Sequence, residues 1–239
     1  FVHGWTPQLD KDESERNSGM EGLDFGYSQS KWVAEQIVHS AADGGLQTRI
    51  FRPALITASR TGYYVRGDIV TGLLGYCIRH GVAPDARNQL SFLPAEICAN
   101  NIIAISRDPD SIGGTYSVTA NRIYTIGTVA GVVSEKFGHP ITMIPFEEFV
   151  DHIDRHCDRM DDLFPLKQFF KKNRNNFRSI EHQRYKSPGY TRFCSLLPDT
   201  MPEPELEVTV GWIVNFLEKN GLVPPPQPVT ARVRETSRA

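Results

Sequence analysis

The sequence has no long run of apolar residues, no Gly-x-x-Gly-x-x-Gly loop and no excess of charge of one sign. No stretch approaches the roughly 20 apolar residues that a membrane span needs, so we expect a soluble chain without a membrane partner. The 26 Lys and Arg residues against 28 Asp and Glu residues give a net charge of −2, which argues against nucleic acid as the main partner. With 239 residues, 40% of them hydrophobic, the chain is long enough to bury a core of one large or two small domains.

Cysteine is also scarce. Cys77, Cys98, Cys157 and Cys194 are widely spaced and form no CxxC pair. Four cysteines in a chain of this size are no disulfide framework, so we expect buried, reduced thiols and a cytoplasmic location. Cys98 lies on the apolar face of a predicted helix, which favours a core role over a nucleophile.

Hydrophobic periodicity predicts alternating helices and strands in the first half of the chain. The clearest helix runs over residues 27–42, and the β-rich run 47–54 that follows is predicted to be a buried strand. Further helices are predicted at 67–80, 94–106, 126–137, 147–156 and 206–219, and further strands at 90–93, 114–118 and 141–144. This alternation is typical of an α/β fold with a parallel sheet.

Beyond residue 120, helical patterns dominate. We therefore predict an α/β domain part at 1–120, a helical subdomain at 121–223 and a flexible tail at 224–239. Residues 165–187 mix cations with aromatic residues, which fits amphipathic helices better than nucleic-acid binding. The remaining alternative for this stretch is a docking face for an acidic protein.

Tyr27 and Lys31 carry the most informative chemistry in the sequence. They lie four residues apart at the start of a predicted helix, so both side chains face the same way. A phenol is a poor acid–base catalyst at neutral pH, but an adjacent ammonium stabilises its phenolate form. The same lysine can reach a sugar hydroxyl of a bound nucleotide. The alternative is an ordinary exposed pair on a helix.

The surrounding motifs resemble the extended short-chain dehydrogenase/reductase family. Within that family they look like the thioester reductase domains of nonribosomal peptide synthetases, polyketide synthases, carboxylic acid reductases and aminoadipate reductases. The resemblance rests on Gly-Tyr-Ser-Gln-Ser-Lys-Trp-Val-Ala-Glu at 26–35, Phe-Arg-Pro-Ala-Leu-Ile-Thr at 51–57, Thr61-Gly62 and Gly67-Asp68. It implies the C-terminal part of a Rossmann-like parallel sheet, followed by a mostly helical subdomain for substrate binding and carrier docking.

The resemblance also implies an activity and its residues. A thioester on the phosphopantetheine arm of a carrier protein would be reduced by NADPH and released as an aldehyde or alcohol. Tyr27 would protonate the substrate oxygen, and Lys31 would hold the nicotinamide ribose and tune Tyr27. Pro53, Ala54, Leu55 and Ile56 fall where the strand-end backbone of the family meets the nicotinamide, in keeping with ligand binding at the carboxyl ends of strands.

Several departures from the family pattern matter. Without a glycine-rich loop the chain lacks the phosphate-binding half of the fold, so we expect a preceding polypeptide to supply it. The Ser or Thr that completes the family's triad has only Thr6 as a stand-in, and Pro94-Ala95-Glu96 stands where relatives often have Pro-Val-Asp. Rival interpretations are a fatty acyl-CoA reductase, a nucleotide-sugar epimerase, or a non-catalytic docking module for carrier proteins.

Two weaker candidates remain in the sequence. His152, His156, Cys157 and Asp161 have a spacing that resembles a metal site, but their segment is rich in Asp and Arg, which favours a solvated helix face. We predict no metal site. Asp68 stands at the start of a predicted helix, where it would cap the helix or line the mouth of the site.

Overall fold

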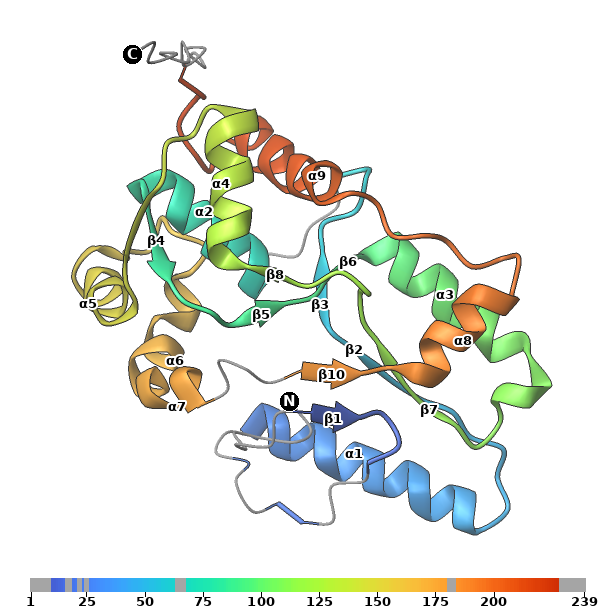
Figure 1. Cartoon of the computed structure of the whole chain (residues 1–239). Coiled ribbons are helices and arrows are strands. Elements are labelled where there is room, and N and C mark those ends of the chain that lie inside the picture. Colours follow the sequence, from blue (N-terminus) through green and yellow to red (C-terminus); the bar gives the residue numbers. More distant parts are fainter. Residues whose placement is uncertain are drawn as a thin grey trace, which may run out of the picture.

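Short parallel strand pairs form the centre of the structure (Figure 1). The computed structural model describes residues 10–15, 19–20, 23, 26–62, 68–179 and 184–227. The parallel pairs are β2 (Ile50–Pro53) with β7 (Thr115–Val118), β3 (Leu55–Thr57) with β6 (Phe92–Pro94), β4 (Val82–Asp85) with β9 (Thr142–Pro145), and β1 (Asp10–Asp12) with β10 (Arg184–Lys186). β5 (Gln89–Leu90) pairs antiparallel with β8 (Tyr124–Thr125). The predicted α/β class with parallel strands is confirmed.

The strand predicted at 47–54 is only partly correct. The chain forms two short strands, β2 and β3, which pair with different partners. Pro53 has no backbone N–H to continue the ladder, and the next amide, that of Ala54, donates to the carbonyl of Val118 (3.0 Å) before the chain turns to β6. Residues 50–52 are only partly buried and Pro53 is exposed, so the prediction of a buried strand is wrong for this segment.

The predicted helices are confirmed to within two residues at their ends. The long helices are α1 (Gly26–Asp43), α2 (Ile69–His80), α3 (Ala95–Arg107), α4 (Ile126–Phe137), α5 (Phe146–His156) and α9 (Leu206–Lys219). The shorter helices α6 (Lys167–Lys172), α7 (Arg174–Ser179) and α8 (Pro188–Leu196) follow α5. The sequence pattern did not predict α8 or β4.

Local chemistry explains where α2 begins and ends. The Asp68 carboxylate accepts hydrogen bonds from the Thr71 amide (2.9 Å) and hydroxyl (2.7 Å), so this residue caps the helix. Gly81 ends the helix at a φ of +68°, in the left-handed region that glycine adopts without steric cost. The predicted capping role of Asp68 is confirmed.

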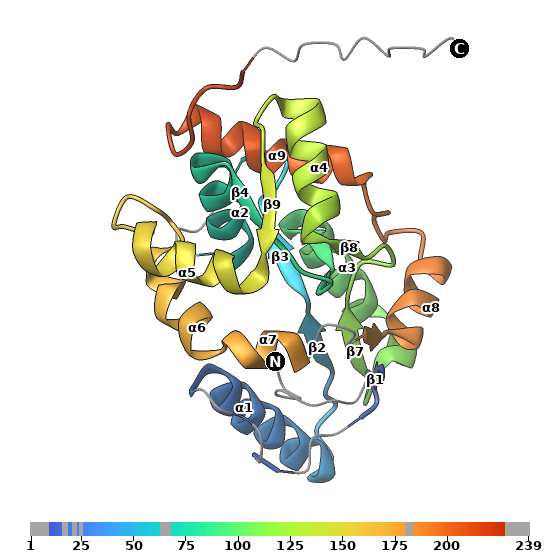
Figure 2. The same cartoon turned by 60° about the vertical axis from the view of Figure 1, so that its left-hand side comes forward.

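Helices α2, α4 and α9 pack together at one end of the molecule (Figure 2). Their buried core includes Val70, Leu74, Val129, Val133, Val210, Ile213 and Leu217. The strand pairs β4–β9 and β5–β8 join residues on both sides of position 120. The division into parts at 1–120 and 121–223 therefore stays a prediction, and it does not separate two independent cores.

A second core lies under α5 and α6, and a third lies between α3, α8 and β7. The aromatic residues Phe169, Phe170 and Phe177 pack against the second core rather than standing in solvent, whereas Lys171 and Lys172 are exposed. This is the arrangement expected of amphipathic helices.

Some sequence predictions concern residues outside the described ranges: Thr6, Gly67 and residues 228–239 of the predicted tail. Within the described ranges, every helix is too short or too polar to cross a membrane.

Candidate active site

Tyr27 and Lys31 lie on the first two turns of α1 and share one face, as their spacing predicts. Tyr27 is 59% exposed, and the Lys31 ammonium Nζ lies 5.3 Å from the centroid of the Tyr27 ring. The Gln29 amide donates to the carbonyl of Leu23 (2.9 Å), which fixes the start of the helix. A phenol with a cation beside it therefore stands open to solvent and to a ligand.

An ion pair between α1 and β2 holds this helix in place. The Arg52 Nε donates to the Glu35 carboxylate (3.0 Å), and its Nη2 forms a second, shorter contact with the same carboxylate. The two side chains are 10% and 6% exposed. Arg52 also donates to the carbonyls of Glu13 and Glu15, each at 3.0 Å. The arginine before Pro53 thus anchors the helix that carries Tyr27, a role that the sequence pattern did not reveal.

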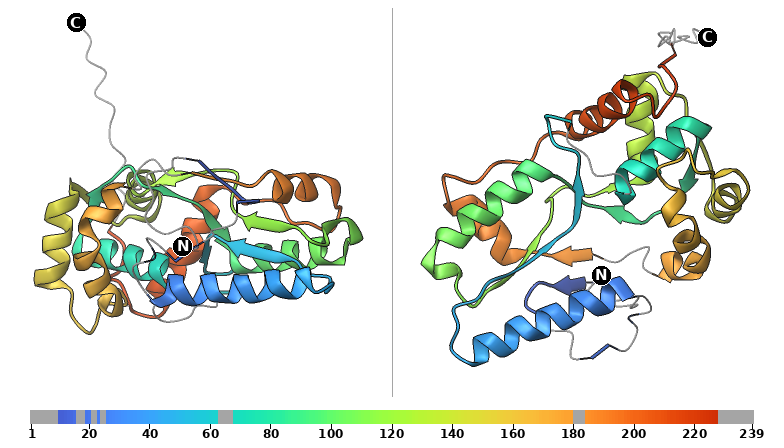
Figure 3. Two further views of the ribbon diagram at one scale, coloured as in Figure 1. Left: turned by 90° about the horizontal axis from the view of Figure 1, so that it is seen from below. Right: turned by 180° about the vertical axis from the view of Figure 1, so that it is seen from behind.

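The apolar positions of α1 do not behave as their spacing predicts. Val33 and Ile37 are 43% and 64% exposed, whereas Ser28 and Glu35 are buried. The helix lies along one edge of the molecule (Figure 3), and among the described residues its inner face is organised by the Arg52–Glu35 pair. The periodicity correctly predicted a helix, but the face that it predicted to be buried is largely open in this chain.

Residues Pro53–Ile56 join the end of β2 to the start of β3, and this strand end combines exposed and partly buried positions. Pro53 and Ile56 are exposed, the latter by 42%, and Ala54 and Leu55 are partly buried. The next residue, Thr57, is buried, and its hydroxyl has no hydrogen-bond partner among the described residues. Because α1 doubles back into β2, the start of the helix and this strand end lie toward the same end of the unit that they form (Figure 1).

Glu96 fastens the loop that follows β3. Its Oε1 accepts a hydrogen bond from the Arg60 amide (2.8 Å). Arg60 lies in a turn that is closed by a hydrogen bond from the Gly62 amide to the Ser59 carbonyl (2.9 Å), with Gly62 at a φ of +74°. Glu96, which stands where relatives often have Asp, therefore makes a structural hydrogen bond beside the strand end.

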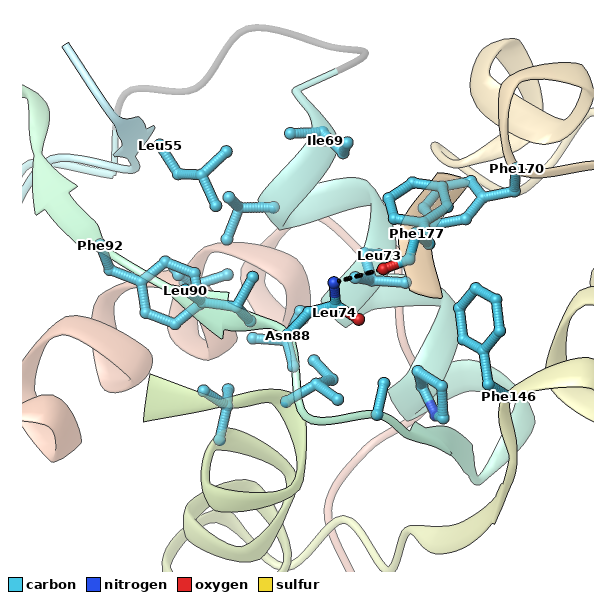
Figure 4. A pocket seen from close by; sticks show the side chains of 16 residues that line it. Leu55, Ile69, Leu73, Leu74, Asn88, Leu90, Phe92, Phe146, Phe170 and Phe177 are labelled. Atoms are coloured by element: carbon cyan, nitrogen blue, oxygen red, sulfur yellow. Dashed lines mark hydrogen bonds between the residues drawn. The ribbon is translucent and has the colours of Figure 1, made fainter. Parts of the chain in front are cut away.

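An apolar chamber of about 110 Å³ opens beside Leu55 (Figure 4). Its walls come from β3, α2, the β4–β6 region, α4, α9 and the aromatic residues of α5, α6 and α7. Asn88 is the single polar side chain among its 16 lining residues, and its amide donates to the Phe177 carbonyl (2.9 Å). The sequence pattern did not predict this chamber, because its walls come from segments far apart in the chain.

The prediction of a solvated helix face for the histidine segment is only partly correct, because His156 is exposed but Cys157 and Asp161 are buried. The Tyr76 hydroxyl and His152 Nδ1 share a hydrogen bond (2.7 Å), and the buried Asp161 carboxylate pairs with His80 (3.2 Å). Burial lowers the pKa of His152, and the nearby His156, His80 and Arg155 add to that effect. These side chains join α2 to the end of α5. The described residues contain no group of three or more ligands able to hold a metal ion.

All four cysteines are free; Cys77, Cys98 and Cys157 are buried and Cys194 is half-buried. Burial raises the pKa of Cys98 to about 11, and burial together with Asp161 raises the pKa of Cys157 to about 12. A thiol with a raised pKa is a poor nucleophile at neutral pH. The predicted core role of Cys98 agrees with its burial.

Comparisons with known proteins place this arrangement in context. Residues 4–102 match an NAD-binding family described as "Male sterility protein". Two relatives are the L-2-aminoadipate reductase of Eremothecium gossypii (its large subunit), 26% identical over 223 residues, and a linear gramicidin synthase of Brevibacillus parabrevis, 26% identical over 204 residues. These alignments cover 87% and 83% of this chain but 16% and 4% of the relatives.

Solved structures of reductase domains also align with this chain. The terminal R domain of the myxalamid PKS-NRPS pathway aligns with a TM-score of 0.83 and 25% identity, covering 95% of this chain and 58% of that one. The reductase domain of a nonribosomal peptide synthetase from Mycobacterium tuberculosis has a TM-score of 0.63 and 18% identity, covering 91% and 57%. The chain thus spans less than two thirds of each relative. The predicted resemblance to these reductase domains, their Rossmann-like fold and a nicotinamide cofactor are supported.

Proposed function

We propose that this chain, a relative of the reductase domains of nonribosomal peptide synthetases, forms the catalytic part of an NADPH-dependent thioester reductase. The observation that carries the proposal is the exposed Tyr27 with the Lys31 ammonium over its ring. The helix that carries both residues is tied by a buried ion pair to β2, which leads into the strand end Pro53–Ile56. The substrate is an acyl or peptidyl thioester on the phosphopantetheine arm of a carrier protein.

The described residues fit one end of a nicotinamide nucleotide. Lys31 would hold the nicotinamide ribose, and the backbone of Pro53, Ala54, Leu55 and Ile56 would meet the nicotinamide ring. The buried hydroxyl of Thr57, next to that strand end, has no hydrogen-bond partner within the part of the chain that the structure describes. The sequence contains no glycine-rich turn for the diphosphate, so in our proposal a preceding Rossmann-half polypeptide supplies that end of the site.

The chemistry of the chain centres on the phenol. When bound, the reduced nicotinamide supplies a hydride to the thioester carbon. The Tyr27 hydroxyl donates its proton to the carbonyl oxygen as negative charge develops there, and the Lys31 ammonium stabilises the resulting phenolate. The resulting hemithioacetal returns its hydroxyl proton to the Tyr27 phenolate as the carbon–sulfur bond breaks, and the sulfur leaves with the bonding electron pair, which releases an aldehyde and the carrier thiolate. A second reduction of the aldehyde would yield the alcohol.

Support for the carrier-protein partner comes from the relatives. A thiolation-reductase di-domain from an archaeal nonribosomal peptide synthetase has a TM-score of 0.63 to this chain, and a linear gramicidin synthase matches it by sequence. The missing phosphate loop favours one rival, a docking module that binds carrier proteins without catalysis.

Substitution of Tyr27 by Phe tests the catalytic proposal. In the full-length protein, we expect turnover of a carrier-bound thioester to fall by about 10²–10⁴, with NADPH affinity changed only a few-fold, because the variant loses one proton donor. Tyr124→Phe, which removes a hydroxyl from β8, is the matched control and should keep wild-type turnover. Equal turnover in the wild type and Tyr27→Phe would refute the catalytic role, and carrier binding without turnover in the wild type would favour the docking module.

A further inference from the structure

The apolar chamber beside Leu55 has a size and chemistry that select a ligand. We propose that it holds the acyl end of the thioester substrate and prefers a compact apolar group of about four or five carbon atoms. This inference rests on the proposed reductase function and adds the class of substrate. Its occupant is the acyl group, rather than the cofactor or the pantetheine arm.

The walls exclude polar occupants. Of the 16 lining residues, only Asn88 has a polar side chain, and its amide already donates to the Phe177 carbonyl. A ribose, a diphosphate or a pantetheine amide buried here would lose its hydrogen bonds to water without replacing them, which is costly. An alkyl group loses nothing of this kind and gains the burial of its surface.

Leu55 connects the chamber to the proposed reaction site. It belongs to the strand end Pro53–Ile56, and its side chain also lines the chamber. Figure 4 shows Leu55 at one side of the space and the aromatic side chains of Phe146, Phe170 and Phe177 at the other. An acyl group whose thioester carbon stands at this strand end therefore has its apolar end directed along the chamber.

The volume limits the size of the group. A cavity of about 150 Å³ accommodates benzene, which corresponds to roughly 25 Å³ for each carbon atom. The chamber of about 110 Å³ therefore holds four or five carbons. The stacked rings of Phe170 and Phe177, with centroids 5.3 Å apart, form a wall that a longer chain would have to displace.

A series of N-acetylcysteamine thioesters tests the proposal by calorimetry on the full-length protein. Each buried methylene should improve affinity about fourfold, so the 3-methylbutanoyl thioester should bind at least tenfold more tightly than the acetyl thioester. The octanoyl thioester should bind no more tightly than the 3-methylbutanoyl one. Equal affinity for the acetyl and 3-methylbutanoyl compounds, or continued tightening to octanoyl, would overturn the proposal.

Two substitutions in the wall act in opposite directions. Ala86→Leu adds three carbons, roughly 75 Å³ by the same scaling, and should remove the preference for 3-methylbutanoyl over acetyl. Leu73→Ala enlarges the chamber and should shift the preference to octanoyl, a gain that misfolding cannot produce. Ala99→Leu on the exposed face of α3 is the matched control and should leave the series unchanged. If neither wall substitution changed the order of affinities, the chamber would not be the acyl site.

The proposed reductase function and the proposed acyl site can be refuted independently. Size-dependent binding that Ala86→Leu removes, with no reduction of any thioester, would refute the reductase function and uphold the apolar acyl site. Reduction with equal kcat/KM for all three thioesters would uphold the function and overturn the site.

Discussion

Neutralising Glu35 is the sharpest test of how the structure holds Tyr27 in place. Glu35→Gln keeps the shape of the side chain but leaves the Arg52 guanidinium, which is 10% exposed, without its counter-charge. Removal of one partner from a buried ion pair typically costs about 3–5 kcal/mol. Arg52 keeps its hydrogen bonds to the carbonyls of Glu13 and Glu15, so we expect a loss at the lower end, about 3 kcal/mol.

Thermal unfolding measures this loss directly. For a chain of this size each kcal/mol lowers the midpoint by about 2–4 °C, so Glu35→Gln should unfold about 6–12 °C below the wild type. The matched control is Glu207→Gln, which breaks an exposed pair with Lys136 (3.2 Å, side chains 55% and 52% exposed). Exposed pairs contribute little, so the control midpoint should be unchanged within error.

The same variant separates anchoring from general stability. If the pair positions α1, turnover in the full-length protein should fall at a temperature where Glu35→Gln is still folded by circular dichroism, and Glu35→Asp should restore part of it. Equal midpoints for Glu35→Gln and Glu207→Gln would refute the claim that a buried charge pair anchors this helix.

Three further predictions follow from the site and its surroundings. Lys31→Ala should raise the KM for NADPH and lower kcat, because in the proposed site the ammonium holds the ribose and lies over the Tyr27 ring, whereas Lys172→Ala on the exposed face of α6 should change neither in steady-state kinetics. Residues 1–239 alone should bind NADPH weakly, because the diphosphate has no glycine-rich turn; micromolar affinity by calorimetry would contradict this. His152 has a lowered pKa in the folded chain, so the unfolded state binds protons first and stability should fall as pH drops below about 6.5. Melting midpoints at pH 7.5 and 5.5 should differ less in His152→Gln.

How much of the fold the sequence predicts depends on how local the determining interactions are. The helices at 126–137 and 206–219 were predicted to the residue, because their apolar faces pack on each other and their ends have capping residues such as Gly138 at a φ of +70°. β4 was missed because it has four residues and includes Pro84, which normally argues against a strand. It forms a strand because it pairs in parallel with β9, whose residues lie sixty positions later in the chain.

The candidate site shows the same contrast between local and non-local interactions. Tyr27 and Lys31 were predicted as a pair because a helix brings residues four apart together, and their shared face needs no tertiary information. Arg52 and Glu35 stand in adjacent elements, but nothing in their local patterns shows that one is the partner of the other. Their burial depends on how α1 doubles back on β2. Charged residues are almost never fully buried unless paired, so a glutamate on the inner face of a helix next to an arginine at a strand end is a pattern that predictions for related chains can use.

The chamber, in contrast, depends entirely on packing between segments that are distant in the sequence. Its lining joins Leu55, the α2 leucines, and Phe170 and Phe177 from a stretch whose sequence pattern indicates only an amphipathic helix. Each of these residues is an ordinary apolar position in its own element, and only the packing leaves a space between them. The proposed reaction centre, which combines one helix with one strand end, can therefore be predicted from local motifs. In our proposal the choice of acyl group is instead a property of packing, and it should change with single substitutions, such as Ala86→Leu, that leave every motif intact.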